Sequence, residues 1–188
     1  PLKSFGVNIK SQKGMLPIEF VGSTLLKPIK YVENKGSAQI KTCIILSAIN
    51  THGVTKLKAI KSRDHTELML KSLNYPIRIK RTNKFDLIEV KGRSQFNGFD
   101  YHVPGDISSA SFFIVLTLLS KNSELLIKNI NINPSRTGII TILNRMNAKI
   151  KIINRKKYKG EKIGDLKIKS TKDLKSINCP QSLNSSTI

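Results

Sequence analysis

The chain contains an internal repeat, and no other feature limits its possible folds as strongly. Ser62-Arg63 recurs as Ser135-Arg136, 73 positions further on. A longer match supports this pairing, since LKSLNYPIRI (70–79) aligns with LNRMNAKIKI (143–152) at the same offset. The opening LKSFGVNI (2–9) also resembles residues 70–77, at an offset of 68. Such repeats are typical of chains built from copies of one supersecondary unit, each covering a neighbour's apolar face.

Hydrophobic periodicity predicts the element order βαβαββ in both copies. In the first copy we expect these elements at 26–32, 37–50, 54–60, 64–74, 76–82 and 86–91. In the second copy we expect them at 99–103, 107–120, 123–130, 136–147, 149–154 and 165–169. The flanking segments resemble parts of further copies, namely the end of a helix at 1–4, strands at 7–10 and 16–21, and a first strand at 174–177. This pattern predicts an α/β (α+β) fold of repeated βαβαββ units.

A boundary between the copies is expected near Pro104-Gly105, where the strand breaks and Asp106 can cap the next helix. That helix, 107–120, is apolar almost all round, so we expect it to be buried as the inner helix of its copy. Both ends of the chain interrupt a copy of the repeat. We therefore expect an internal fragment that is marginally stable alone, although half-units also serve as natural caps in repeat arrays.

The net charge of +21 by itself favours a nucleic-acid partner. The cations are spread evenly along the chain, however, and aromatic residues make up only 6% of it, with no Trp to stack on bases. We interpret the charge as a solvated, Lys-rich exterior and expect no nucleic-acid partner. No apolar run is long enough to span a membrane and no signal peptide is seen, so we expect a cytoplasmic protein without membrane contact.

The residues that usually carry catalysis or bind metals do not form a recognisable set. Cys43 lies in an apolar run and Cys179 in a polar tail, without a CxxC motif or a nearby His at ligand spacing. We expect two free thiols in a reducing compartment, and neither a metal nor a cofactor. The three histidines, His52, His65 and His102, fit turn, helix and strand positions better than the role of a base. The chain therefore offers binding groups and no convincing acid, base or nucleophile.

Two helix starts carry the candidate binding residues. The first places Ser37 and Gln39 beside the unpaired N–H groups and positive dipole end of a helix, which attract anions. Gly36 allows the backbone to approach a ligand closely, and the small Ala38 leaves room for one. The alternative is that Ser37 is an ordinary N-cap, which would stabilise the helix by about 1 kcal/mol and bind nothing.

The second helix start lies at Arg63. Asp64 and Glu67 have the spacing of a capping box, so we interpret both as structural. Arg63 is different, because a cation at a helix N-terminus opposes the dipole there, and a bidentate oxyanion would explain its position. The matching Arg136 leaves open that one of the two arginines only holds the fold. The predicted substrate-binding residues, facing one pocket for a phosphate ester, are Ser37, Ala38, Gln39 and Arg63.

Five ordered motifs resemble the 5-enolpyruvylshikimate-3-phosphate synthase family over nearly the whole chain. They are SAQIKT (37–42), NTHGVT (50–55), SRDHTELML (62–70), VPGDISSASFF (103–113) and NPSRTGII (133–140). The SAQ and SRDHTE variants resemble the bacterial branch that includes glyphosate-insensitive enzymes. The resemblance implies a cytoplasmic transferase of chorismate and aromatic amino acid biosynthesis, monomeric at full length, which moves enolpyruvyl from phosphoenolpyruvate onto shikimate 3-phosphate without a cofactor.

The same resemblance implies a division into lobes and a set of substrate contacts. Residues 1–103 would belong to the middle lobe and residues 104–188 to the second lobe of an inside-out α/β barrel protein. The family's shikimate 3-phosphate contacts carry over to Ser37, Ala38, Gln39 and Arg63, with Gln39 also facing phosphoenolpyruvate.

The sequence also departs from the family's full pattern. The N-terminal Lys, Ser and Arg that hold both substrates have no counterpart, and the catalytic Asp would follow the last residue. We therefore predict that this chain has no catalytic residue, no measurable transferase activity and weak affinity for shikimate 3-phosphate. Two alternatives stay open, namely a relative of the UDP-N-acetylglucosamine enolpyruvyl transferase and a noncatalytic basic module that binds nucleic acid.

Overall fold

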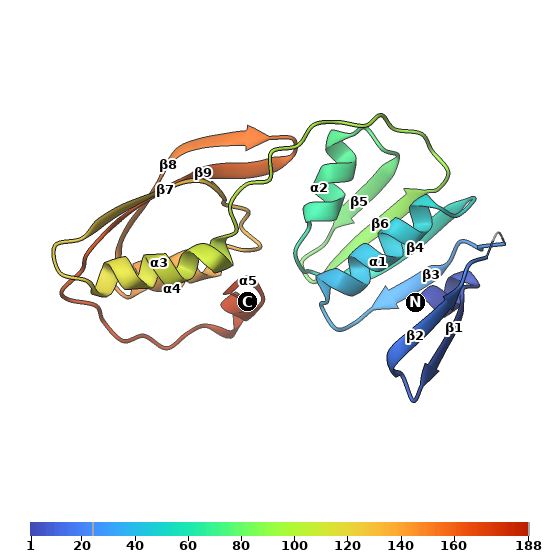
Figure 1. The fold of residues 1–188 in the computed structure, drawn as a ribbon, viewed down its shortest axis with the longest axis horizontal. Helices are drawn as coiled ribbons and strands as arrows, with labels where there is room; N and C mark the ends of the chain where they lie inside the picture. Colours follow the sequence, from blue (N-terminus) through green and yellow to red (C-terminus); the bar gives the residue numbers. More distant parts are fainter. Residues whose placement is uncertain (24, 188) are drawn as a thin grey trace. The chain divides into compact units, whose positions relative to one another are not determined.

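The computed structural model describes residues 1–23 and 25–187. The chain divides into two compact units, Pro1–Asn97 and Gly98–Ile188, which we call unit 1 and unit 2 (Figure 1). Each unit has its own cluster of buried apolar side chains. The two units can therefore be compared as separate copies of one design.

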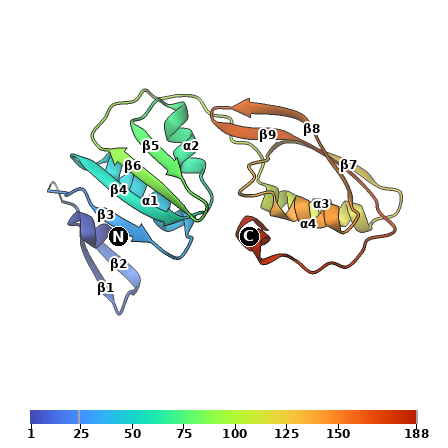
Figure 2. The ribbon, with the colours of Figure 1, turned by 180° about the vertical axis from the view of Figure 1, so that it is seen from behind.

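Unit 1 contains a four-stranded sheet with two helices on one of its faces. Its elements are η1 (Leu2–Phe5), β1 (Asn8–Gln12), β2 (Met15–Val21), β3 (Lys30–Glu33), α1 (Ala38–Ile49), β4 (Val54–Ile60), α2 (His65–Ser72), β5 (Ile77–Arg81) and β6 (Phe85–Lys91). The order in the sheet is β3-β4-β6-β5, with β3 parallel to β4 and the other pairs antiparallel. Figure 2 shows the opposite face of this sheet, on which none of the described helices of unit 1 lies. β1 and β2 form a separate antiparallel hairpin.

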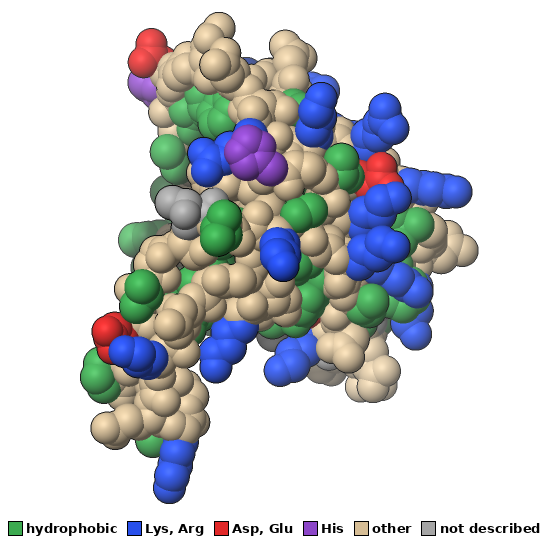
Figure 3. Space-filling model, turned by 90° about the vertical axis from the view of Figure 1, so that its right-hand side faces the viewer, with side chains coloured by type: hydrophobic (Ala, Val, Ile, Leu, Met, Phe, Trp, Pro, Cys, Tyr) green, Lys and Arg blue, Asp and Glu red, His purple; other side chains and the backbone are tan. Residues whose placement is uncertain are grey.

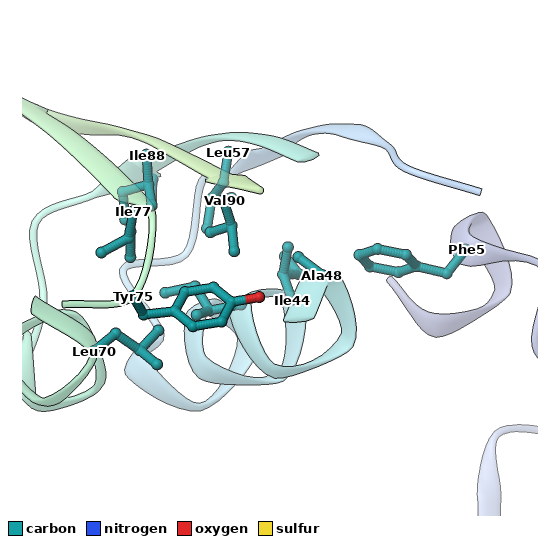
Figure 4. Close-up of a cluster of buried hydrophobic side chains, with 11 residues drawn as sticks. Phe5, Ile44, Ala48, Leu57, Leu70, Tyr75, Ile77, Ile88 and Val90 are labelled. Atoms are coloured by element: carbon teal, nitrogen blue, oxygen red, sulfur yellow. The ribbon is translucent and has the colours of Figure 1, made fainter. Parts of the chain in front are cut away.

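The core of unit 1 follows from two periodicities that meet between α1 and the sheet. Alternate residues of β4 are buried, including Leu57 and Ala59, as expected for a strand with one covered face. On α1, Ile44 and Ala48 lie one turn apart and are buried against this face (Figure 4). Phe5 of η1 is completely buried and extends the same cluster. The helix start at Ser37 is thereby fixed to the end of β3.

Unit 2 repeats this arrangement with a three-stranded sheet. Its elements are α3 (Ile107–Leu119), β7 (Glu124–Asn131), α4 (Gly138–Arg145), β8 (Lys149–Tyr158), β9 (Glu161–Lys169), η2 (Gln181–Leu183) and α5 (Asn184–Thr187). The order is β7-β9-β8, with both pairs antiparallel. This is the order of β4, β6 and β5 in unit 1, so the predicted repeat is confirmed in three dimensions for these strands.

The expected first strand of unit 2, at 99–103, is absent from the described structure, and the prediction was wrong. A single parallel bridge, between Gly105 and Ile130, takes the place of β3. Pro104 has no N–H to donate to a ladder. The bridge is also tight, since a Cβ on Gly105 would lie 2.7 Å from the Ile130 side chain. A larger residue at this position would require the end of the Ile130 side chain to move, and glycine avoids that.

Other boundaries also differ from the expectation. The strand expected at 26–32 is limited to β3, which begins after Pro28. The segment 174–177 forms no strand, although the amide of Lys175 donates to the carbonyl of Met146. The helix expected at 64–74 ends at Ser72, and Asn74 follows with φ at 56°. Proline precedes β3 and a left-handed residue follows α2, and periodicity alone does not detect these local limits.

The expectation that the helix at 107–120 is buried was also wrong. One face of α3 packs on the sheet, with Ile114 and Leu118 almost fully buried. The apolar face of α3, which we define as Phe112, Phe113, Leu116 and Leu119, is 61–78% exposed. A three-stranded sheet covers only one side of a helix, so a sequence that is apolar all round leaves the other side uncovered.

Candidate functional site

The loop that leads into α1 is organised by an internal carboxylate. Glu33, at the end of β3, is 2% exposed and accepts hydrogen bonds from the amides of Lys35, Gly36 and Ser37 at 2.7, 3.0 and 3.2 Å. These three amides are therefore not free to bind a ligand. Gly36 has φ at 69°, a left-handed conformation that glycine adopts without strain.

Ser37 acts as the N-cap of α1. Its Oγ accepts a hydrogen bond from the amide of Ile40 at 3.3 Å and donates to Oε1 of Gln39 at 3.3 Å. The capping role considered from the sequence is thus present in the structure. Ala38 and Gln39 follow in the first turn, and their amides have no acceptor among the residues that the structure describes. The amides that remain available for an anion at this helix start are those of Ala38 and Gln39.

The start of α2 does not form the predicted capping box. Asp64 occupies the N-cap position without a side-chain capping bond, and its Oδ2 instead binds Arg81 of β5 at 2.5 Å. Glu67 pairs with Lys41 of α1 at 2.7 Å. Both acids are structural, as expected, but they act through ion pairs. A nearby cation offers a carboxylate a stronger partner than a neutral backbone amide does.

The two helix starts of unit 1 line one open pocket of about 440 Å³. Its lining residues are Ala38, Gln39, Thr42, Cys43, Leu46, Arg63, His65 and Thr66. Three of the four predicted site residues, Ala38, Gln39 and Arg63, therefore meet at this pocket, while Ser37 caps the helix that forms its wall. Arg63 is half-buried and forms no ion pair with any acid in the described part of the chain.

The equivalent position in unit 2 is already occupied by an anion of the chain itself. Asp106 is the N-cap of α3, and its Oδ2 accepts a hydrogen bond from the Ser109 amide at 3.2 Å. Its other oxygen binds the guanidinium of Arg136, which also donates to Oγ of Ser108 at 2.9 Å. Arg136 thus helps to hold unit 2 together, whereas the corresponding N-cap in unit 1 is Ser37, which carries no charge.

Electrostatics support this assignment of Asp106. Partial burial works to raise the pKa of Asp106, but the Ser108 amide, the charge of Arg136 and the Ser109 amide outweigh it and hold the pKa below its usual value. The carboxylate therefore stays ionised beside the guanidinium.

The sequence did not single out several residues around the pocket. Glu33 fixes the loop, and Thr42 shares a 2.8 Å hydrogen bond with Thr66 between the two helices. Lys41 is a charged residue in an apolar helical run, and this contrast was a signal that could have identified it. Glu33 had no such signal, because its amide partners are set by the path of the loop.

The other candidates remain outside the site, with one exception. His65 lines the pocket, while His52 and His102 are exposed and do not. Both cysteines are free, with Cys43 half-buried at the pocket wall and Cys179 exposed in unit 2. Among the described residues, no group of three or more His, Cys, Asp and Glu side chains could hold a metal ion. None of the described helices is long and apolar enough to cross a bilayer.

Basic side chains outnumber acidic ones on the face of the molecule that Figure 3 draws. Figure 3 shows Lys and Arg side chains recurring over the face that it draws, with few acidic side chains among them. In unit 1, exposed or partly exposed ion pairs, such as Lys56 with Glu89 at 3.0 Å, neutralise part of this positive charge.

The fold and its pocket define an α/β repeat protein in which helix starts of one unit share a site. The model of the EPSP synthase (3-phosphoshikimate 1-carboxyvinyltransferase) family matches residues 1–182, and the chain belongs to this family.

Similar proteins agree with this assignment. The chain is 40% identical over 184 residues to a 3-phosphoshikimate 1-carboxyvinyltransferase of Legionella pneumophila (strain Corby), covering 97% of the chain and 41% of that relative. It is 43% identical over 175 residues to a protein of the same name from Petrotoga mobilis, covering 91% of the chain and 40% of that relative. A structure of EPSP synthase from Acinetobacter baumannii superposes on the chain with a TM-score of 0.81 at 34% identity. The superposition covers 97% of this chain and 41% of that one. The chain thus spans about two fifths of the length of these relatives.

Proposed function

We propose that this chain forms part of an enzyme that transfers the enolpyruvyl group of phosphoenolpyruvate to the 5-hydroxyl of shikimate 3-phosphate. In that reaction a C–O bond forms between the hydroxyl oxygen and C2 of phosphoenolpyruvate, and the C2–O bond to phosphate breaks. The pocket of unit 1 would bind shikimate 3-phosphate through Arg63, Gln39 and the amides of Ala38 and Gln39, with Ser37 at its rim.

One observation carries this proposal above the others. Arg63 lies at a helix start without an acidic partner among the residues that the structure describes, while its repeat equivalent Arg136 is neutralised by Asp106. A half-buried guanidinium at the positive end of a helix dipole is unfavourable without an anion. Since a carboxylate fills the matching place in unit 2, an oxyanion of the substrate is the natural occupant in unit 1.

The remaining roles in the reaction are assigned to parts of the enzyme that this chain does not contain. Proton donation to the methylene carbon and removal of the hydroxyl proton need positioned acids and bases. The pocket of unit 1 offers none with a suitable arrangement beyond His65. We therefore propose that the chain alone binds substrate weakly and has no transferase activity.

The wider assignments rest on the family. We propose that residues 1–103 form part of one lobe and residues 104–188 part of the other, in a cytoplasmic, monomeric full-length enzyme of the bacterial branch that includes glyphosate-insensitive members. The names of the matching relatives favour shikimate 3-phosphate over the UDP-sugar alternative. A nucleic-acid partner would be distinguished by a steep loss of affinity with salt, because many phosphates are neutralised at once, whereas one bound phosphate gives a shallow slope.

The proposal is tested by the binding of shikimate 3-phosphate, followed by ³¹P NMR. We expect the signal of the ester to shift on addition of the chain, and Arg63→Ala to remove that shift. Arg78→Ala is the matched control, because Arg78 is an exposed arginine of the same unit outside this pocket. Equal binding by the parent and Arg63→Ala would contradict the proposed site, and turnover by the purified chain would contradict the division of roles.

The two cysteines provide an independent test in the unmodified chain. Cys43 lines the pocket, and Cys179 is exposed in the other unit. Shikimate 3-phosphate should slow the alkylation of Cys43 by iodoacetamide, because the bound ester covers the pocket wall, and should leave Cys179 unaffected. Mass spectrometry of the two peptides measures both rates in one sample. Equal rates at Cys43 with and without a saturating concentration of the ester would place the ligand elsewhere.

A further inference from the structure

A fully buried ion pair joins the two helices that begin at the pocket. Lys41 of α1 and Glu67 of α2 have side-chain exposures of 0% and 2%, and Nζ lies 2.7 Å from Oε1. The contact is a close ion pair without the alignment of a good hydrogen bond. Neither Nζ nor the second carboxylate oxygen, Oε2, has a hydrogen-bond partner among the described residues.

Such a pair is an expensive way to join two helices. Removing both charges from water costs free energy that their mutual attraction offsets only when further hydrogen bonds satisfy them, and no described residue supplies such a bond to Nζ or Oε2. Burial accordingly raises the pKa of Glu67, against the lowering effect of the Lys41 ammonium. Apolar side chains of similar size would fill the same space at lower cost, so stability alone does not account for the pair.

The position of the pair suggests what it does. Lys41 lies one turn after Ser37, whose carbonyl accepts the Lys41 amide at 3.1 Å, and Glu67 lies one turn after Arg63. A second cross-link, the 2.8 Å hydrogen bond between Thr42 and Thr66, joins the same turns. Both contacts thus set the distance between the helix starts that line the pocket. A non-directional apolar contact would leave the two helices freer to slide.

We propose that Lys41 and Glu67 are positioning residues, which hold the starts of α1 and α2 at the spacing at which Gln39 and Arg63 bind one phosphate ester. This inference rests on the proposed function, because it concerns the same pocket. The pair does not touch the ligand; it acts through the helix starts. Bidentate binding by a guanidinium depends on geometry, so a small shift of one helix should weaken it strongly.

The test separates positioning from packing by two double variants of the whole chain. Lys41→Met with Glu67→Met replaces the pair by apolar side chains, and we expect an unchanged or higher thermal midpoint together with an affinity for shikimate 3-phosphate lowered about tenfold or more. Lys41→Gln with Glu67→Gln restores a neutral, directional contact, and we expect it to keep the affinity near that of the parent. The control, Lys56→Met with Glu89→Gln, removes a pair that is not buried and should change neither quantity.

The outcomes are read from the thermal midpoint, the dissociation constant and the ³¹P shift of the bound ester. Positioning is supported if the double Met variant keeps its thermal midpoint but binds the ester weakly and with an altered ³¹P shift. The double Gln variant should then bind the ester as the parent does. Parental affinity in the Met pair would overturn the inference, as would loss of affinity in a stable Gln pair. Should the Met pair fail to fold, the Gln pair decides alone. If the parent chain itself shows no binding that depends on Arg63, the proposed function fails first.

Discussion

Arg63 and Arg136 occupy matching positions of the repeat, yet they have different electrostatic partners. The difference arises mainly from one residue, the N-cap of the preceding helix, which is Ser37 in unit 1 and Asp106 in unit 2. The serine cap satisfies one amide, and within the described part of the chain no acid pairs with Arg63, while the aspartate cap satisfies an amide and the guanidinium of Arg136 together. The identity of the N-cap is thus one difference between the open pocket of unit 1 and the ion pair at the matching place in unit 2.

This comparison predicts the effect of Ser37→Asp. The new carboxylate should pair with Arg63 as Asp106 pairs with Arg136, and should thus occupy the place of the substrate's phosphate. We expect affinity for shikimate 3-phosphate to fall about tenfold or more, since a charge-assisted hydrogen bond contributes about 1.5–3 kcal/mol. Stability should be unchanged or slightly higher, because Asp and Ser are similarly good N-caps and a partly exposed ion pair adds about 1 kcal/mol or less. Isothermal titration and urea unfolding measure the two quantities, with Ser37→Asn as the neutral control.

At the scale of elements, helix starts connect the fold to the site. α1 begins at an internally satisfied loop, and α3 begins at an ion pair that joins it to the loop before α4. The termini of these helices are therefore fixed by charges as well as by packing. The pKa of Asp106 is lowered, so its folded form binds a proton less readily than its unfolded form. Its contribution to stability is present above its ordinary pKa of 3.8 and is lost as the pH falls through the lowered folded value.

The variant Asp106→Asn tests this contribution. Asn keeps the N-cap and removes the charge, so at neutral pH we expect the variant to be less stable by about 1 kcal/mol or less, given the partial exposure of the pair. The difference in free energy of unfolding between the variant and the parent should be constant at higher pH and should disappear as the pH falls below about 4. Urea unfolding at a series of pH values, followed by circular dichroism, measures it. A difference that does not depend on pH would assign the effect to packing.

At the scale of the whole molecule, each unit has a core of its own and one unit exposes a large apolar surface. The apolar face of α3 contains Phe112, Phe113, Leu116 and Leu119, and Leu46 of α1 is half exposed in unit 1. So many exposed apolar side chains on one helix face are unusual for the surface of a soluble monomer. They agree with the expectation of marginal stability, which stays a prediction.

The exposure of α3 can be measured directly by the binding of anilinonaphthalene sulfonate. The chain should bind the dye at neutral pH without denaturant, and Phe112→Gln with Leu116→Gln should lower the fluorescence while preserving the circular dichroism of the fold. Thr141→Gln, an exposed polar position on α4, is the control. Glutamine changes no charge, so the anionic dye reports apolar surface. Unchanged fluorescence in the double variant would show that this face of α3 is covered in solution.

The sequence by itself determined the repeat, the order of most elements and the two turns that line the candidate pocket. These features depend on local patterns: the alternation of apolar residues in β4, the capping residues Ser37 and Asp106, and the recurrence of Ser-Arg before the second helix of each copy. Such patterns act within a few residues along the chain, so they can be read without knowing which segments meet.

The tertiary structure alone decided which charges pair and which apolar faces are covered. Glu33 accepts hydrogen bonds from the loop amides, Lys41 of α1 pairs with Glu67 of α2, and Asp106 pairs with Arg136, thirty positions away in the chain. It also decided that a bridge at Gly105 replaces a strand and that α3 is covered on one side only. The physical reason is that pairing and burial depend on distances between segments remote in the chain, which hydrophobic period and residue type leave undetermined.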